Sequence, residues 1–119
     1  PYKGKTGIRR LINAFKYSVA GTFAAFKHED AFRQEVILTL ILIPVAIYYG
    51  QTAFDQALMI SSLIFIIVVE LLNSAVEATV DRISVKRHKL AKRAKDIGSA
   101  AVFFSLMNAA IIWFLILVK

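Results

Sequence analysis

ALMISSLIFIIVVELLNSAVEATVD, residues 57–81, is the stretch that decides the fold. Residues 57–69 are almost wholly apolar, and the pattern continues far enough for a membrane-spanning helix, which needs about 20 apolar residues. At about 1.5 Å per residue, Glu70 then lies roughly 20 Å into this helix. An acidic side chain at such depth is costly, and by default it indicates a functional site.

A polar stripe continues from Glu70 along the same helix. Asn73 and Glu77 follow at spacings of three and four residues, which places all three on one side. Glu70 and Glu77 are roughly 10 Å apart, so they suit separate roles, such as a proton acceptor and a metal ligand. Mg²⁺ prefers oxygen ligands and takes only one or two carboxylates from protein, so Glu29 or Glu35 could supply a second. The alternative is a stripe that only holds helices together through polar contacts.

Two further apolar runs predict two more membrane spans. Residues 36–49 are too short to span alone, so their helix must begin earlier and draw Glu35 toward the bilayer. Residues 97–118 are long enough unaided. The 119-residue chain is 58% hydrophobic, above the usual share for a soluble domain, and leaves no room for a second domain. We expect an all-α membrane protein with a single domain over 1–119 and spans at about 30–50, 56–84 and 94–118.

The segment before the first span predicts a different kind of helix. Apolar side chains recur at helical spacings across residues 7–27, while Arg9, Arg10 and Lys16 occupy much of the remaining surface. This pattern is typical of an amphipathic helix that lies in the membrane interface. A helix packed on other protein is the alternative. The apolar positions are Ile8, Leu11, Ile12, Phe15, Val19, Phe23 and Phe26.

The distribution of charge predicts the orientation in the membrane. Of the 15 Lys and Arg residues, seven lie in residues 1–35, before the first apolar run, seven lie in residues 82–95 and none lies in residues 50–56. Basic segments favour the cytoplasmic side, so we expect the N-terminus inside and the C-terminus outside. The net charge of +7 thus indicates membrane topology and disfavours nucleic-acid binding.

The absence of cysteine excludes disulfides and a cysteine nucleophile. We expect the chain to insert by its own first span, with a few native residues before Pro1.

Three strings carry a resemblance to a known family. They are ELLNSAVEATVDR at residues 70–82, AKDIGSAA at residues 94–101 and AFRQE at residues 31–35. On these strings the chain resembles the prokaryotic diacylglycerol kinases, from about Gly7 to Trp113. The resemblance implies a homotrimer of three-span subunits, each with an N-terminal surface helix, in the bacterial inner membrane. It also implies an enzyme that transfers the γ-phosphate of MgATP to diacylglycerol, giving phosphatidic acid at the cytoplasmic face.

The resemblance also assigns roles to individual residues. Glu70 matches the general base, and Glu29 and Glu77 match the ligands of Mg²⁺. The positions that match ATP contacts are Arg10, Tyr17, Glu29, Asn73, Glu77, Lys86, Arg87, His88, Lys95 and Asp96. The positions that match the lipid substrate or the active-site wall are Ala14, Arg33, Gln34, Glu35, Glu70 and Ser99.

Two other functions stay open on the sequence. Undecaprenol kinases form a branch of the same family, although Arg82 and residues 98–100 are closer to the diacylglycerol branch. A small membrane subunit without enzymatic activity, or a carrier that binds protons at Glu70, is compatible with the polar stripe alone. Transfer of phosphate to a lipid would separate these alternatives.

Overall fold

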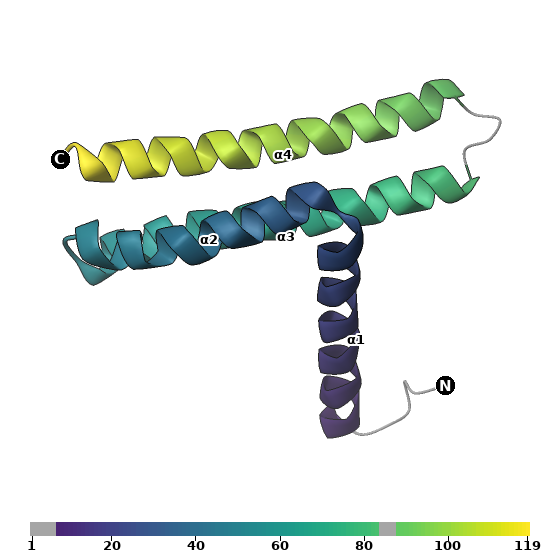
Figure 1. Ribbon diagram of the computed structural model, residues 1–119, viewed down its shortest axis with the longest axis horizontal. Helices are drawn as coiled ribbons and strands as arrows, with labels where there is room; N and C mark the ends of the chain where they lie inside the picture. Colours follow the sequence, from purple (N-terminus) through teal and green to yellow (C-terminus); the bar gives the residue numbers. More distant parts are fainter. Residues whose placement is uncertain (1–6, 84–87) are drawn as a thin grey trace.

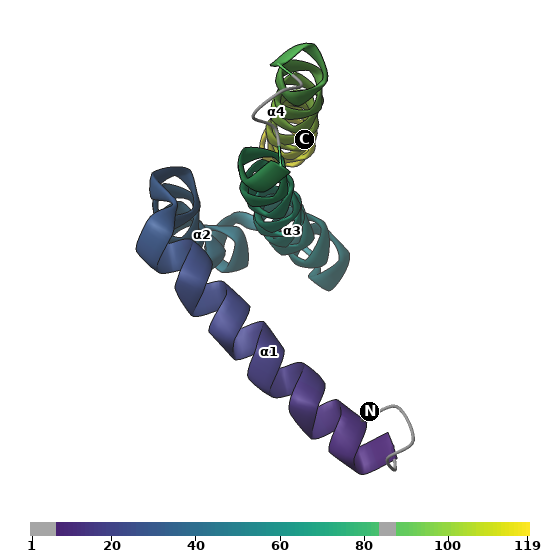
Figure 2. The same cartoon turned by 90° about the vertical axis from the view of Figure 1, so that its right-hand side faces the viewer.

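The computed structural model describes residues 7–83 and 88–119, and within these residues the chain forms four α-helices (Figure 1). Helices α2, α3 and α4 run side by side in alternating directions, and α1 lies crosswise to them (Figure 1, Figure 2). Helix α3 is central, because it packs against both α2 and α4. The bounds are α1 Gly7–His28, α2 Asp30–Tyr49, α3 Ala53–Ile83 and α4 His88–Leu117.

Three of these helices are long and apolar enough to cross a membrane, within the described part of the chain. The prediction of an all-α, multi-pass membrane protein is thus confirmed. At about 1.5 Å per residue α3 is ~46 Å long, which exceeds the roughly 30 Å of a bilayer's hydrocarbon core. Its C-terminal end and the start of α4 extend past the junction of α1 and α2 (Figure 1). The candidate spans are Asp30–Tyr49, Ala53–Arg82 and Lys89–Leu117.

Helical structure covers part of the basic segment at residues 82–95. Helix α3 ends at Ile83, inside the span expected at about 56–84, and α4 begins at His88, before the span expected at about 94–118. Residues 88–95 contain only Lys, Arg, Leu, Ala and His, of which the first four are good helix formers, and no helix breaker. Much of the basic segment therefore forms the first two turns of α4.

A single residue, Glu29, separates α1 from α2. Its φ of −118° and ψ of 112° are extended, so the chain changes direction there. The Nη1 of Arg33 donates to the carbonyl oxygens of Phe26, at 2.6 Å, and Lys27, at 3.0 Å. Carbonyl groups at a helix C-terminus lack hydrogen-bond donors within the helix, and the Arg33 side chain supplies these donors. Arg33 also forms an ion pair with Asp30, so it fixes the junction of the two helices.

The turn between α2 and α3 is held by two side chains. The Oγ1 of Thr52 accepts a hydrogen bond from the backbone N–H of Asp55 at 3.0 Å, which makes Thr52 the N-cap of α3. The Nε2 of Gln56 donates to the carbonyl oxygens of Ile47, at 3.0 Å, and Gly50, at 3.2 Å. A Cβ on Gly50 would lie 2.5 Å from the Cγ of Gln56, so this turn requires glycine.

The end of the bundle near this turn contains a packed core. Ala46, Met59 and Ile116 are buried there and come from three different helices. The Nε1 of Trp113 donates to the carbonyl oxygen of Met59, at 3.2 Å, and to the Oγ of Ser62, at 3.1 Å. These bonds tie α4 to α3 through the side chain of an aromatic residue.

An ion pair closes the same end. The Nζ of Lys119 lies 2.9 Å from Oδ1 and 2.8 Å from Oδ2 of Asp55. The Asp55 side chain is only 4% exposed, whereas that of Lys119 is 50% exposed. Elsewhere large apolar side chains of the three long helices stay on the surface, such as Leu40, Phe65 and Phe104. This exposure suits helices whose solvent is lipid rather than water.

Candidate functional site

Two buried polar side chains, Glu70 and Asn73, form the centre of the candidate site. Their exposed fractions are 4% and 8%. They share one side of α3 because residues three apart on a helix are neighbours. Glu35 of α2 lies beside Glu70, and Gly98 of α4 lies beside Asn73, so residues of both neighbouring helices cover these two side chains.

A second acid, Glu35 of α2, lies beside Glu70. The two carboxyl groups are close enough to share a hydrogen bond when one of them carries a proton. Two ionised carboxylates offer only acceptors, so neither then satisfies the other. The Oε1 of Glu35 is buried and has no hydrogen-bond partner within residues 7–83 and 88–119. The pair thus presents acceptor oxygens that a donor such as a hydroxyl group can meet.

Asn73 bonds to the next acid of the stripe. Its Nδ2 donates to the Oε2 of Glu77 at 3.4 Å, one helical turn away. Its Oδ1 is buried and finds no donor in the described part of the chain. The amide therefore holds the Glu77 carboxylate from one side, and its own oxygen faces α4.

A hollow of about 590 Å³ lies between α1 and α3, and Glu29 is on its wall. Ser74 and Ala78 line it from the side of α3. The Glu29 side chain makes no capping hydrogen bond to α2 in the described structure, which leaves its carboxylate available. Glu29 and Glu77 both interact electrostatically with Glu70. The helix junction and α3 thus bring acids from distant parts of the sequence into one region.

The donor set fits a metal ion that arrives with other ligands. The described residues contain no group of three or more His, Cys, Asp or Glu side chains that could hold a metal. Mg²⁺ usually takes one or two protein carboxylates and completes its shell with phosphates and water. The two carboxylates predicted as ligands, Glu29 and Glu77, would be enough for such an ion, whereas a closed structural metal site would need more ligands.

Helix α4 presents two of the predicted nucleotide contacts as members of ion pairs. The Nζ of Lys95 lies 2.6 Å from the Oδ1 of Asp81, which joins α4 to α3. The Nζ of Lys92 lies 2.8 Å from the Oδ2 of Asp96, within α4. All four side chains are substantially exposed, so these pairs can exchange partners with an incoming ligand.

The structure does not bring every predicted residue to the acids. Arg10, Ala14 and Tyr17 are exposed on the N-terminal half of α1, and Tyr17 is 66% exposed. This half (purple) projects away from the other helices (Figure 2). Their role in binding ATP or lipid stays a prediction, because a single chain does not bring these residues to the acids.

The remaining predicted residues are dispersed as well. Gln34 and Ser99 are exposed on α2 and α4, respectively. Arg33, matched to the lipid site, makes its described contacts at the junction of α1 and α2. Lys86 and Arg87 lie outside the described residues, and of His88 only the helical backbone is described.

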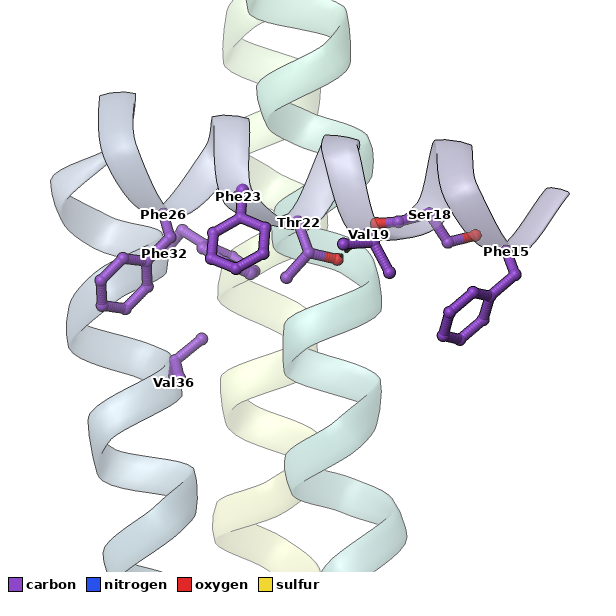
Figure 3. Close-up of a pocket in the computed structure, with 8 residues that line it drawn as sticks. All are labelled: Phe15, Ser18, Val19, Thr22, Phe23, Phe26, Phe32 and Val36. Atoms are coloured by element: carbon purple, nitrogen blue, oxygen red, sulfur yellow. Dashed lines mark hydrogen bonds between the residues drawn. The ribbon is translucent and has the colours of Figure 1, made fainter. Parts of the chain in front are cut away.

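An apolar groove of about 550 Å³ between α1 and α2 is a feature that sequence reasoning missed (Figure 3). Phe15, Val19 and Phe23 line it from α1, and Phe32 and Val36 line it from α2. The sequence shows the apolar face of α1 but not the angle at which α2 leaves it. The signal for this groove that the sequence offered was the closeness of Phe32 to the junction of α1 and α2. Such a groove suits an acyl chain.

The fold and the site together define an integral membrane protein whose central span carries a buried acidic site. A sequence profile described as prokaryotic diacylglycerol kinase matches residues 16–117. The chain belongs to this family.

Similar proteins match over nearly their whole length. A diacylglycerol kinase of Pseudomonas aeruginosa is 52% identical over 117 residues, which cover 98% of this chain and 95% of the relative. One of Haemophilus influenzae is 52% identical over 108 residues, covering 91% and 92%. One of Escherichia coli K12 is 45% identical over 112 residues, covering 94% and 92%.

Proposed function

We propose that this chain is an ATP-dependent diacylglycerol kinase. It transfers the γ-phosphoryl group of ATP to the free hydroxyl of diacylglycerol, giving phosphatidic acid and ADP at the cytoplasmic face of the bacterial inner membrane. The observation that carries the proposal is the buried Glu70, beside Glu35, in a chain of this family. A lipid hydroxyl can reach an acid at that depth without leaving the bilayer.

Glu70 is the general base in this proposal. It accepts the proton of the lipid hydroxyl as the hydroxyl oxygen bonds to the γ-phosphorus. The bond between that phosphorus and the β–γ bridging oxygen breaks, and ADP leaves with the oxygen. A positioned base of this kind contributes about 10²–10⁴-fold to the rate. Glu35 lies beside Glu70, and its buried Oε1, which has no hydrogen-bond partner among the described residues, offers an acceptor near the same point.

Glu29 and Glu77 are the proposed ligands of Mg²⁺. When bound, Mg²⁺ neutralises charge on the β- and γ-phosphates during transfer. The hydrogen bond from Asn73 orients the Glu77 carboxylate. Lys95 and Asp96 of α4, with the segment 86–88, complete the nucleotide site. Lys95 would exchange its exposed partner Asp81 for a phosphate.

The proposal includes a homotrimer in which neighbouring subunits share each site. The support is geometric, since Arg10, Ala14 and Tyr17 lie on the half of α1 that projects away from the acids of their own chain (Figure 2). On α3 the small residues Ala75 and Ala78 are exposed beside the acidic stripe and permit close approach of another helix. Residues from one subunit's α1 would meet another subunit's α3.

The membrane arrangement belongs to the same proposal. Helix α1 lies in the cytoplasmic interface with its apolar face toward the bilayer, the N-terminus is inside and the C-terminus is outside. The groove between α1 and α2 then opens into the hydrocarbon and takes an acyl chain of the substrate. Arg33, Gln34, Glu35 and Ser99 are the residues proposed to contact the head of that lipid, those of different helices coming from neighbouring subunits where one chain does not bring them together.

One assay tests the reaction. Purified protein in mixed micelles receives MgATP labelled at the γ-phosphate and either diacylglycerol or undecaprenol. We expect labelled phosphatidic acid to dominate. Stronger labelling of undecaprenol would make the chain an undecaprenol kinase, and labelling of neither lipid would favour a membrane subunit or carrier without kinase activity.

Mixing subunits tests the shared site. Arg10→Ala and Glu70→Gln variants are each expected to have little activity alone. Co-assembled from one mixture, they should regain part of it, because some sites then combine an intact α1 with an intact α3. A fully active monomer in detergent would contradict the trimer.

A further inference from the structure

At the level of Asn73, helix α4 presents a glycine to α3. A Cβ on Gly98 would lie 2.0 Å from the Oδ1 and 3.2 Å from the Cγ of Asn73. Non-bonded heavy atoms do not approach to such a distance, so a side chain at position 98 and the present position of Asn73 exclude each other. By contrast, a Cβ on Gly7 or Gly21 would meet nothing within 4 Å in the described structure.

The Asn73 amide is held between two neighbours. Its Nδ2 faces the Oε2 of Glu77 at 3.4 Å. Only the nitrogen of an amide can donate to a carboxylate, so the oxygen must point the other way, toward α4. There Oδ1 is buried, has no N–H or O–H donor among the described residues, and lies against the Cα of Gly98. A Cα–H group gives it only a weak contact.

We propose that Gly98 is a positioning residue for the site that holds Mg²⁺ and ATP. Its missing side chain leaves the space that the Asn73 oxygen occupies, and this sets the direction in which the amide nitrogen holds Glu77. The inference rests on the proposed kinase function, because it gives Glu77 the role of a metal ligand. In this proposal Gly98 acts only through the position of Asn73.

The effect of Gly98→Ala follows from which atoms can move. The atom in conflict is the end of the Asn73 side chain, which rotates more easily than the backbone of α4. Alanine is also a better helix former than glycine. The variant is therefore expected to fold, with the Asn73 amide rotated away from the Glu77 carboxylate.

The test combines direct binding with a double-mutant cycle. Binding of Mn²⁺ together with a non-hydrolysable ATP analogue is measured by electron paramagnetic resonance, without lipid substrate. Gly98→Ala should weaken it about 10-fold, at the low end for a hydrogen bond to a charged group because the bond is long. The KM for MgATP should rise by a similar factor, while kcat at saturating MgATP changes less than KM.

The double-mutant cycle distinguishes an effect on the position of the Asn73 amide from general damage to α4. In an Asn73→Ala background the space above Gly98 is already empty, so adding Gly98→Ala should change Mn²⁺–nucleotide binding less than about 2-fold. An equal loss in both backgrounds overturns the proposal, and so does unchanged binding in Gly98→Ala alone. Gly7→Ala is the matched control and should bind as wild type.

Two further outcomes are decisive. If Gly98→Ala does not assemble, the double variant with Asn73→Ala should, because the conflicting atoms are gone; failure of that rescue overturns the proposal. Wild type that does not phosphorylate diacylglycerol overturns the proposed function. Active wild type with an unaltered Gly98→Ala variant overturns only the role of Gly98.

Discussion

The two ends of the α3–α4 pair use polar side chains in opposite ways. At the end near the α2–α3 turn, the indole N–H of Trp113 bonds to α3 and the buried Asp55 pairs with Lys119. We call this the closed end. Each of these groups has a partner within the chain, although the Oδ2 of Asp55 is met only by the ion pair with Lys119 and not by a hydrogen bond, and the contacts join helices. Such polar contacts hold membrane helices together.

The opposite, acidic end leaves such groups without partners. Three buried oxygens there accept no hydrogen bond within the part of the chain that the structure describes: Glu35 Oε1, Asn73 Oδ1 and Ser74 Oγ. Buried polar groups are costly unless satisfied, so unsatisfied ones indicate a missing donor such as a ligand, water or a neighbouring subunit. The difference separates structural from functional polar residues on the same helix.

Glu70→Gln should have the largest effect. Glutamine keeps the size and much of the hydrogen bonding of glutamate but cannot accept the proton, so turnover should fall roughly 10²-fold or more. Folding, assembly and MgATP binding should stay normal, and kcat with nucleotide binding measures both. Ser62→Ala, at the closed end of the same helix, should keep its turnover. Retention of more than a few tenths of wild-type turnover would remove Glu70 from the catalytic role.

Loss of a proposed metal ligand comes next. Glu77→Gln and Glu29→Gln should each raise the Mg²⁺ concentration for half-maximal activity by about 10-fold, since one charged hydrogen-bonding or ligand group is lost. High Mg²⁺ or Mn²⁺ should restore part of the activity. Activity measured against Mg²⁺ concentration gives the shift. Near-normal metal dependence in both variants would exclude this pair as the ligands.

Lys119→Gln should affect stability but leave catalysis unchanged. The substitution leaves the buried Asp55 carboxylate without its cation. We expect the free energy of unfolding to fall by about 1–2 kcal/mol. This is less than for a fully buried pair, because Lys119 is half exposed. Denaturation by dodecyl sulfate, followed by circular dichroism, measures this loss. The double variant with Asp55→Asn should recover most of it. A loss of turnover in stable Lys119→Gln would contradict the separation of the two ends.

Trp113→Phe should have the smallest effect. It removes the N–H that the carbonyl oxygen of Met59 and the Oγ of Ser62 share, at a cost of about 1 kcal/mol. Ser62 keeps its own bond to Met59, at 2.7 Å, so no acceptor there becomes wholly unpaired. The same denaturation measurement applies. If Trp113→Phe and Lys119→Gln lowered the free energy of unfolding equally, an unpaired buried charge would cost no more here than a lost neutral hydrogen bond, which contradicts this ranking.

The sequence predicted the features that depend on one helix at a time. Long apolar runs indicated the three spans, and helical spacing placed Glu70, Asn73 and Glu77 on one side of α3. It could not predict contacts that depend on the register between helices. The fit of Asn73 against Gly98 requires the relative height of α3 and α4, which no local pattern encodes.

The angle between α1 and α2 could not be predicted from the sequence either. Phe32 and the apolar face of α1 form one groove only because the chain turns at Glu29. Arg33 matched a lipid-site position, yet its described contacts stabilise that turn. The trimer, the Mg²⁺ ligands and the nucleotide contacts stay predictions, since each involves atoms beyond a single chain.

The one-residue junction at Glu29 has a mechanical consequence. Any tilt of α1 against α2 must be taken up by the φ and ψ angles of that residue or by bending of the helices beside it. The carboxylate attached there is a proposed metal ligand, so the tilt changes its position relative to Glu77. Membrane thickness and curvature act on how a surface helix lies. In the proposed membrane arrangement, Glu29 would thereby link the shape of the lipid surface to the geometry of the acidic end.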